Sequence, residues 1–462
     1  MHALSIFGTS SDAGKSTLAF ALTYLAHHRG IKVAPFKAQN VSNNSQVCDS
    51  GGELAQAQYF AAASINLPTQ SDFNPVLLKS GQANRAALIV NGVAVGEKDV
   101  RAYYKDIDTL KPIVIDAFKR LQNTFELIIA EGAGSPVELN LMQKDLSNIT
   151  IAETFNTKIV LVADIERGGV FASIWGVYNL LPQHLKHNVI GVIVNKFRGD
   201  KTLFDEGVTI IEKNFGLKVF GVVPYLPFNL GFEDMQSLEN YTQTAQENAL
   251  KVAVIKLPHI SNFTDFEPLV NDEEVLLSFI TTPHNLHTYD LIILPGTKRT
   301  IVDLAWLREQ GFEKALHTYK GFIVAICGGY EMMFESLSDP EGVEDKKGLV
   351  VEGLSRLKGE VIFSSEKVVK KGTYKLFGHL LEGYEIHNGK CDTLGSQSER
   401  FYGTFLHGLF DNNNFRTELF KTLIPTYKGY DFQLFKKEEI ATFASHIEKS
   451  VDVDALLKCL DE

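Results

Sequence analysis

A short stretch of sequence, FIVAICGGYEMMF at Phe322–Phe334, constrains the fold of this chain more than any other. Its apolar run ends at Cys327, two glycines follow, and the pattern then suits a helix. The stretch predicts a strand, a sharp turn and a helix, with Cys327 at the turn. Such a turn exposes a nucleophile and brings amide N–H groups near a developing oxyanion. The same stretch also fits a buried cysteine that ends a core strand, because free cysteine is among the most buried residue types.

A histidine far along the chain favours the catalytic interpretation of Cys327. An apolar strand is predicted over Phe401–Leu406, and His407 follows it directly. A thiol needs a base to become a thiolate at neutral pH, and this base can be remote in sequence. A lone histidine at a strand end is more often structural, and His387 in GYEIHNG is a rival base. The combination of Cys327 and His407 is more specific than either residue alone.

A second motif lies near the N-terminus, where the apolar strand Leu4–Phe7 runs into GTSSDAGKST and then into a helical pattern. Strand, glycine-containing loop and helix form the usual setting of a phosphate-binding loop. In such a loop backbone N–H groups face the anion and Lys15 reaches the terminal phosphates. The hydroxyl of Ser16 or Thr17 can ligate Mg²⁺.

The spacing of this loop departs from the standard pattern. Five residues rather than four separate Gly8 from Gly14, and Thr9 stands where the first glycine would be. The alternative interpretation is a turn that only starts a helix. Because GKST follows a strand and precedes a helix, we predict a nucleotide site.

Polar residues end several predicted strands of the N-terminal half, namely Lys37, Glu131, Asp164 and Asn195. Ligands of open α/β sheets gather at the carboxyl ends of the strands, so these side chains are expected beside the phosphate loop. Glu131 suits a Mg²⁺ ligand, and Asn195 suits the adenine edge, with a solvated strand end or a polar strand cap as the alternatives. The predicted ATP-binding residues are Thr9, Gly14, Lys15, Ser16, Thr17, Lys37 and Asn195, and the predicted metal ligands are Ser16 and Glu131.

The order of the predicted elements gives the fold class and the domains. Alternating strands and helices up to about residue 225 predict a doubly wound parallel sheet. A polar stretch then predicts a linker or connecting helix, and a second α/β series begins at Val252. We predict a nucleotide domain at 1–232, a linker at 233–250, a second α/β domain at 251–435 and a helical tail at 436–462.

Charge and cysteine content exclude several classes of function. The net charge of −11 argues against a nucleic-acid partner, because no basic face is available to release counterions from phosphates. No apolar run is long enough to span a bilayer, and no secretory leader is found. The cysteines are far apart and form no CxxC pair, which fits neither a zinc site nor a disulfide framework. A reducing cytoplasm is the simplest setting for these cysteines: Cys48, Cys327, Cys391 and Cys459.

Many ordered motifs together resemble the cobyric acid synthase family, the glutamine-dependent amidases of cobalamin biosynthesis, over essentially the whole chain. The motifs are GTSSDAGKST, APFKAQN, GGELAQAQ, NPVLLK, AEGAGSPVELNL, LVADIERGGVFAS, GVIVNKFRGD, LPGTKRT, ICGGYEMM, EGYEIHNG and GTFLHGLFD. The APFKAQN segment separates the chain from the related a,c-diamide synthases.

The resemblance implies two domains with known chemistry. The first is similar to dethiobiotin synthetase, whose phosphate loop shares the extra residue, and the second is a class I glutamine amidotransferase domain of the cobalamin type. In that family Cys327 would attack the glutamine carboxamide, and His407 would carry the proton from the thiol to the leaving ammonia. Backbone near Gly296 and Gly328 would stabilise the oxyanion.

The resemblance also implies the second half of the reaction. ATP and Mg²⁺ would activate a corrinoid carboxylate as an acyl phosphate, and ammonia would then displace phosphate to give an amide. The family does this at the b, d, e and g side-chain carboxylates of adenosylcobyrinic a,c-diamide. A carboxylate is a poor electrophile and free ammonia is scarce at neutral pH, so the chemistry needs both ATP and glutamine.

The chain departs from the family pattern at several positions. Ala325 stands two residues before the cysteine, where a glycine is usual, and Glu331 replaces the usual glutamine of GGYQ. Leu409 stands where many class I amidotransferases have the third, acidic member of the triad. Asp411 is a possible substitute for that acid.

Two other classes of function stay open from the sequence. One is a P-loop partition or assembly ATPase whose C-terminal domain only binds a partner, although Cys327 and His407 count against it. The other is a related amidotransferase that acts on a different carboxylated substrate, such as an earlier corrinoid or a cell-wall lipid precursor.

Overall fold

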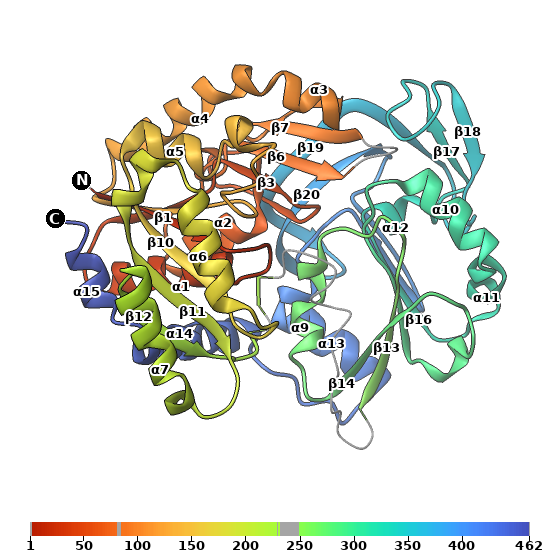
Figure 1. Cartoon of the computed structure of the whole chain (residues 1–462). Helices are drawn as coiled ribbons and strands as arrows, with labels where there is room; N and C mark the ends of the chain where they lie inside the picture. The colour runs from red at the N-terminus through yellow and green to blue at the C-terminus, as the bar shows by residue number, and fades with distance from the viewer. Residues whose placement is uncertain (1, 81–84, 229, 232–248, 462) are drawn as a thin grey trace. The chain divides into compact units, whose positions relative to one another are not determined.

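The computed structural model describes residues 2–80, 85–228, 230–231 and 249–461 (Figure 1). The chain forms two compact units. Unit 1 comprises Met1–Ser42, Cys48–Phe228 and Lys437–Glu462, and unit 2 comprises Asn43–Val47 and Asn229–Lys436.

The predicted domain order therefore needs two additions. A short segment near residue 45 belongs with the second unit, and the C-terminal tail belongs with the first. With these additions we propose the predicted division into two domains. The predicted linker at 233–250 lies outside the described residues except at its end, where Leu250 begins a strand.

Unit 1 is built around a parallel six-stranded sheet. Its strands are apolar and almost fully buried, as expected for a parallel sheet covered on its faces. In spatial order they are β12 (Val219–Pro224), β11 (Val189–Phe197), β10 (Lys158–Asp164), β1 (His2–Gly8), β9 (Leu127–Glu131) and β2 (Val33–Phe36). Because β1 lies between β9 and β10, the loop after β1 lies beside the ends of both strands.

Helices pack their apolar faces against this sheet. Ile174 and Val177 pack in one cluster with Leu161 and Val192, and a second cluster joins β9 to the helix before it. The helices of unit 1 are α1 (Lys15–His28), α2 (Gln56–Ser64), α3 (Val100–Lys105), α4 (Ile107–Gln122), α5 (Ile149–Phe155), α6 (Val170–Leu180), α7 (Asp205–Ile210), α15 (Val453–Lys458) and most of α14 (Phe432–Ser450). A second sheet contains β3 (Gln39–Val41), β6 (Val76–Ser80), β7 (Arg85–Val90) and β8 (Val93–Asp99).

The C-terminal helices are held to unit 1 by specific contacts. Arg29, at the end of α1, bonds Glu448 and Asp454 at 2.8 Å each. The N–H of Asp452 donates to the carbonyl of Phe220 on β12 at 2.8 Å. The tail therefore contacts both the helix that follows the phosphate loop and an edge strand of the sheet.

Unit 2 contains a second mostly parallel sheet. In spatial order its strands are β14 (Val275–Ile280), β13 (Leu250–Ile255), β15 (Leu291–Leu294), β16 (Phe322–Ile326), β22 (Phe401–Thr404) and the antiparallel β21 (Gly395–Ser398). A smaller sheet contains β18 (Leu349–Glu352), β17 (Ser336–Asp339), β19 (Glu360–Leu376) and β20 (His379–Lys390). The helices are α9 (Glu267–Val270), α10 (Thr300–Glu309), α11 (Phe312–Thr318), α12 (Gly328–Glu331) and α13 (Asn413–Leu423).

The predicted fold class, α/β with parallel sheets in both halves, is confirmed. Two local predictions differ in extent. The strand before His407 ends at Thr404 rather than Leu406, and the helix after the cysteine turn is only four residues long.

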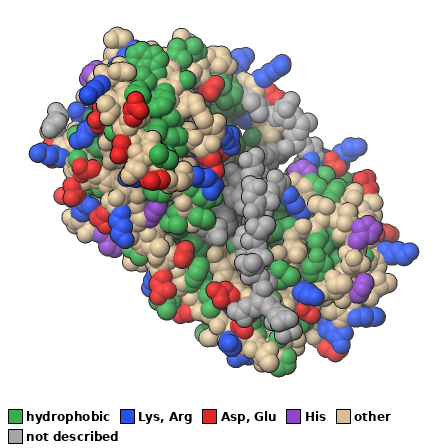
Figure 2. Space-filling model, turned by 60° about the horizontal axis from the view of Figure 1, so that its bottom comes forward, with side chains coloured by type: hydrophobic (Ala, Val, Ile, Leu, Met, Phe, Trp, Pro, Cys, Tyr) green, Lys and Arg blue, Asp and Glu red, His purple; other side chains and the backbone are tan. Residues whose placement is uncertain are grey.

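None of the helices in the described part of the chain has the length and apolar content needed to span a bilayer. On the face in Figure 2, acidic and basic side chains are interspersed rather than gathered by sign.

Candidate active sites

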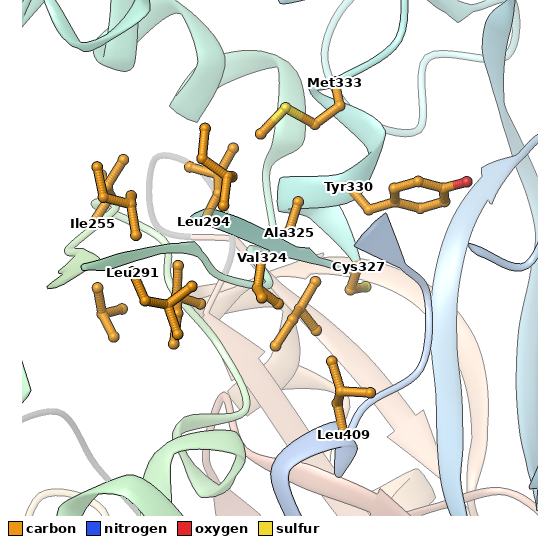
Figure 3. Packing of buried hydrophobic residues seen from close by; sticks show 14 of the residues in the cluster. Ile255, Leu291, Leu294, Val324, Ala325, Cys327, Tyr330, Met333 and Leu409 are labelled. Atoms are coloured by element: carbon orange, nitrogen blue, oxygen red, sulfur yellow. The ribbon is translucent and has the colours of Figure 1, made fainter. Parts of the chain in front are cut away.

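Cys327 lies at a strained turn directly after β16. Figure 3 shows it at the end of the strand that carries Val324 and Ala325. Its φ of 50° and ψ of −114° are unusual for a residue with a side chain. A hydrogen bond to the neighbouring strand β22 fixes the turn, because the Cys327 N–H donates to the carbonyl of Thr404 at 2.8 Å. Backbone strain of this kind persists only where the surrounding structure enforces it, and it clusters at functional sites.

The two glycines after Cys327 are required by close packing. A Cβ on Gly328 would lie 2.6 Å from the Thr297 side chain, and a Cβ on Gly329 would lie 2.2 Å from the carbonyl oxygen of Leu294. The Gly328 N–H lies close enough to the Cys327 sulfur to favour its thiolate and to lower its pKa. The start of α12 thus presents a backbone N–H beside the sulfur, as an oxyanion site requires.

The structure brings Cys327 and His407 together around Gly296. A Cβ on Gly296 would lie 2.9 Å from His407 Cε1, 3.7 Å from His407 Nε2 and 3.6 Å from Cys327 Cβ. The absence of a side chain at Gly296 therefore leaves space where the imidazole and the cysteine converge. All three predicted residues lie in unit 2.

Asp265 binds the other side of the His407 ring, and the sequence did not identify this residue. Its Oδ2 lies 2.7 Å from His407 Nδ1, and its Oδ1 accepts the Gly408 N–H at 2.8 Å. Asp265 and His407 are each 1% exposed, and 142 residues separate them. The carboxylate fixes the tautomer that leaves Nε2 as the acceptor. A polar residue soon after strand β13, on a turn at Phe263–Phe266, was the available signal.

Asp411 does not take the place that the sequence suggested. It lies in a short turn after His407, and burial raises its pKa to about 6. In the described part of the chain, the carboxylate that bonds His407 is Asp265.

His387, the rival base, is engaged elsewhere. Its Nδ1 lies 2.7 Å from the Gly389 carbonyl and its Nε2 lies 3.2 Å from Glu385 Oε2. Its ring also stacks on Phe405 at 4.0 Å between centroids. Since both ring nitrogens have partners, this histidine is less suited to take a proton from Cys327 than His407 is.

The surroundings of Cys327 favour a neutral thiol in the resting protein. Burial raises the pKa of the Cys327 thiol, and the charge of Glu331 raises it further. The sulfur also lies 3.6 Å from the carbonyl of Ile386, where the thiol can donate. Glu331 is itself buried, which raises its pKa, and it accepts the Thr300 hydroxyl at 2.6 Å. A base is therefore needed to form the thiolate.

The change Glu331→Gln is expected to shift the pH profile of Cys327 alkylation by iodoacetamide to lower pH. Alkylation requires the thiolate, so its rate rises as the pH passes the thiol pKa. Removing a nearby negative charge lowers that pKa, and the rise then begins at lower pH. Mass spectrometry of the modified peptide measures the rate, with the exposed Glu309→Gln as the control. Identical profiles for the Glu331 variant and the unsubstituted protein would contradict this assignment.

The phosphate loop of unit 1 lies between β1 and α1, as predicted. Gly14 has φ of 91°, and a Cβ there would lie 2.1 Å from Asn195 Nδ2. Lys15 Nζ donates to the Ser10 carbonyl at 2.9 Å, so its ammonium lies over the loop. The backbone N–H of Thr9 donates to Val162 on β10, which continues the sheet into the loop.

Glu131 is the centre of a buried polar network at the end of β9. Its Oε1 accepts the Ser16 hydroxyl at 2.6 Å and the Lys37 ammonium at 2.7 Å, and its Oε2 accepts Gln58 Nε2 at 3.1 Å. Asn40 donates to Gln58 in turn, at 3.3 Å. The second predicted metal ligand, Ser16, and the predicted ATP-binding residue Lys37 thus meet at the carboxylate of the first, Glu131.

This network fits the binding of Mg²⁺ together with a nucleotide. The hydroxyl of Ser16 and the carboxylate of Glu131 are oxygen ligands, which Mg²⁺ prefers. Within the described residues, no group of three or more His, Cys, Asp or Glu side chains could hold a metal by itself. Mg²⁺ typically uses one or two carboxylates and completes its coordination with water and substrate phosphates.

Two other strand-end residues make structural contacts that the sequence did not specify, and the adenine role of Asn195 stays a prediction. Asn195 Nδ2 donates to the Ala13 carbonyl at 2.9 Å, so its amide supports the phosphate loop. Asp164 lies 3.1 Å from Lys196 Nζ and accepts the Glu166 N–H at 2.7 Å. Thr17 donates its hydroxyl to the Gly14 carbonyl at 3.0 Å, which leaves Ser16 as the hydroxyl that meets Glu131.

Comparisons with known proteins cover both units. Residues 4–229 match the model of the CobQ/CobB/MinD/ParA nucleotide binding domain, and residues 251–415 match the CobB/CobQ-like glutamine amidotransferase domain. The chain is 51% identical to the cobyric acid synthase of Acinetobacter baylyi over 464 residues, which covers 100% of both chains. It is 37% identical to the cobyric acid synthase of Herpetosiphon aurantiacus, over 99% of this chain and 98% of the relative. The cobyric acid synthase of Syntrophobacter fumaroxidans is 36% identical, with the same coverage. The chain therefore belongs to the cobyric acid synthase family, as its motifs predict, and it joins a nucleotide-binding domain to a glutamine amidotransferase domain.

Proposed function

We propose that the protein uses ATP and glutamine to amidate the b, d, e and g side-chain carboxylates of adenosylcobyrinic a,c-diamide. The product would be adenosylcobyric acid. One observation carries the proposal: a single chain contains two sets of side chains suited to the two halves of this reaction. In one, Cys327, His407 and Asp265 lie close together. In the other, Ser16 beside the phosphate loop donates to Glu131. The full-length likeness to curated cobyric acid synthases supports a corrinoid acceptor.

The geometry around Cys327 supports the following steps for the glutamine half of the reaction. His407 Nε2 takes the thiol proton, and the sulfur attacks the carboxamide carbon of glutamine. The Gly328 N–H and the backbone near Gly296 stabilise the oxyanion that forms. The imidazolium gives its proton to the leaving nitrogen, so ammonia departs and a thioester remains. Water then releases glutamate and restores the thiol.

The ATP half takes place at the phosphate loop of unit 1. Lys15, Lys37 and the loop N–H groups bind the phosphates. Ser16 and Glu131 would hold Mg²⁺, which would supply positive charge beside the phosphates. An oxygen of the acceptor carboxylate attacks the γ-phosphorus, and ADP leaves. Ammonia then attacks the carbonyl carbon of the acyl phosphate, the bond from that carbon to the phosphate oxygen breaks, and inorganic phosphate leaves with the proton that ammonia loses.

The test is mass spectrometry of adenosylcobyrinic a,c-diamide incubated with the protein, ATP, Mg²⁺ and amide-¹⁵N-labelled glutamine. Stepwise gain of labelled amides is the expected result. Glutamine hydrolysis without any amide gain would keep the amidotransferase chemistry and reject this acceptor.

The change Asp265→Asn is expected to lower kcat for glutamine hydrolysis by about 10²-fold, a typical contribution of positioned acid–base catalysis. An amide cannot stabilise the imidazolium and does not fix the productive tautomer of His407, whereas the glutamine pocket stays intact. KM for glutamine is therefore expected to change little. Steady-state kinetics give both values.

Asp411→Asn is the matched control, because Asp411 lies close to His407 in the chain and is half-buried, but it does not bond His407. Its kcat is expected to stay near that of the unsubstituted protein. A larger loss for the Asp411 variant than for the Asp265 variant would reverse the assignment.

A further inference from the structure

A buried carboxylate of unit 2, Asp303, joins two loops that lie beside the glutamine site. Asp303 is in the first turn of α10 and is fully buried. The first loop, residues 256–262, follows β13 and leads to the turn that carries Asp265. The second loop, residues 295–299, follows β15 and contains Gly296. We call them the β13 loop and the β15 loop. The steps proposed for glutamine hydrolysis do not use Asp303.

Both carboxylate oxygens of Asp303 have donors on these loops. Its Oδ2 accepts the Thr297 hydroxyl at 2.5 Å and the His259 N–H at 3.1 Å. Its Oδ1 lies 2.7 Å from His259 Nδ1. A carboxylate is buried to this extent only where hydrogen bonds satisfy it. Since Thr297 belongs to the β15 loop and His259 to the β13 loop, a single side chain holds the two loops together.

Backbone contacts between the two loops set the orientation of the peptide group after Gly296. The Ser261 N–H donates to the Gly296 carbonyl at 3.0 Å. Next to this bond, Ile260 and Thr297 form an antiparallel bridge. Asp303 bonds the hydroxyl of Thr297, so it fixes the β15 loop at the residue that supplies the N–H of this peptide group.

The direction of this peptide group matters for the oxyanion. Its carbonyl points toward the β13 loop, where Ser261 donates to it. In a trans peptide the N–H points to the opposite side from the carbonyl, so the Thr297 N–H points away from the β13 loop. A Cβ on Gly328 would lie 3.1 Å from Thr297 N. The Thr297 N–H therefore lies near the residue that follows Cys327, where the oxygen of the glutamine carboxamide gains charge.

We propose that Asp303 is a positioning residue for glutamine hydrolysis, which holds the β15 loop where the Thr297 N–H can stabilise the oxyanion. Asp303 acts through the backbone and does not contact the substrate. This inference rests on the function proposed for the Cys327 site. A misplacement of about 1 Å at a reacting site costs about 10²-fold in rate, so the position of this loop has a large effect.

The test compares Asp303→Ala with Asp303→Asn. Alanine removes the acceptor of the Thr297 hydroxyl and of the His259 N–H. Asparagine preserves these contacts, because its carbonyl oxygen can accept from both groups while its NH₂ group donates to the neutral His259 ring. We expect kcat for glutamine hydrolysis to fall about 10²-fold in the alanine variant. In the asparagine variant it is expected to fall by less than about tenfold, the effect of one altered hydrogen bond.

Two further measurements separate a displaced β15 loop from a general loss of structure. KM for glutamine is expected to change little, because an oxyanion donor acts on the transition state rather than on bound substrate. Alkylation of Cys327 by iodoacetamide is expected to keep its rate and pH profile, because this displacement forms no oxyanion. A general loss of structure would change both quantities.

Asp290→Ala is the matched control. Asp290 lies just before the other end of β15, and its Oδ2 accepts the Lys251 N–H at 2.9 Å. It thus removes a carboxylate that also bonds a neighbouring segment, but far along the strand from Gly296. Its kcat and KM are expected to match those of the unsubstituted protein.

Thr297→Val replaces Asp303→Ala if the alanine variant does not fold. It removes only the hydroxyl donor, and kcat is expected to fall about tenfold or more with KM unchanged. Equal losses of kcat in the alanine and asparagine variants would overturn the proposal. So would a full kcat in Asp303→Ala or Thr297→Val, a rise in KM without a loss of kcat, or a loss of Cys327 alkylation alongside kcat.

Failure of the proposed function gives a different result. In that case no amide forms on adenosylcobyrinic a,c-diamide in the unsubstituted protein. Glutamine hydrolysis is measured without an acceptor, so its response to the Asp303 variants still decides the role of this residue.

Discussion

Replacing Cys327 by alanine is expected to reduce glutamine-dependent amidation by at least about 10³-fold, in line with the loss of an enzymatic nucleophile. Amidation with added ammonia is expected to continue, because the phosphate loop and its Glu131 network belong to the other unit. The physical reason is that no other group of the glutamine site can form the covalent intermediate. His407 alone can activate only water.

Mass spectrometry with ¹⁵N-labelled glutamine, and separately with ammonium chloride, measures both activities. Cys459→Ala is the matched control, since Cys459 lies in the C-terminal tail of unit 1. A Cys327 variant that still transfers the glutamine label would remove the cysteine from the mechanism. Loss of both activities would point to a folding defect.

Replacing Lys15 by alanine is expected to give the opposite pattern. Lys15 follows Gly14 at the start of α1, and its ammonium lies over the phosphate loop. Loss of one preorganised charge beside the transferring phosphoryl group costs about 10²- to 10³-fold in rate. Amidation should therefore fall whether glutamine or ammonia is supplied, while glutamine hydrolysis without ATP persists.

The exposed Lys111→Ala on α4 controls for the loss of a positive charge in unit 1. The measurements are ADP release, amide formation and glutamate release under the same conditions. Ammonia-dependent amidation at the unsubstituted rate in the Lys15 variant would exclude the phosphate loop as the site of activation. Together, the Cys327 and Lys15 variants assign one half of the reaction to each unit.

The sequence by itself determined the fold class, and it predicted residues to which we assign the chemistry. The cysteine turn and the phosphate loop are both local motifs. In each, an apolar strand, a glycine turn and a helix start occur within about fifteen residues, so the short-range sequence pattern is sufficient to predict them. Cys327 and Lys15 lie in such motifs, and both are found at strand ends in the structure. The motif order also predicted the family, which the full-length relatives confirm.

The tertiary structure alone decided how distant residues combine at each site. Asp265, not Asp411, bonds His407, because the turn that follows β13 and the segment that follows β22 meet in space. Asn195 turned out to support the phosphate loop through Ala13. No spacing rule links residues 142 positions apart. Such pairs are set by the order of strands in the sheet.

The same reason explains two segments whose packing the sequence did not specify. The segment Asn43–Val47 packs with unit 2, and the tail from Lys437 packs with unit 1. A polar or short amphipathic segment carries no local signal of which core buries it. Only the available neighbours, such as Tyr384 for Val47 and Phe220 for Asp452, decide where it lies.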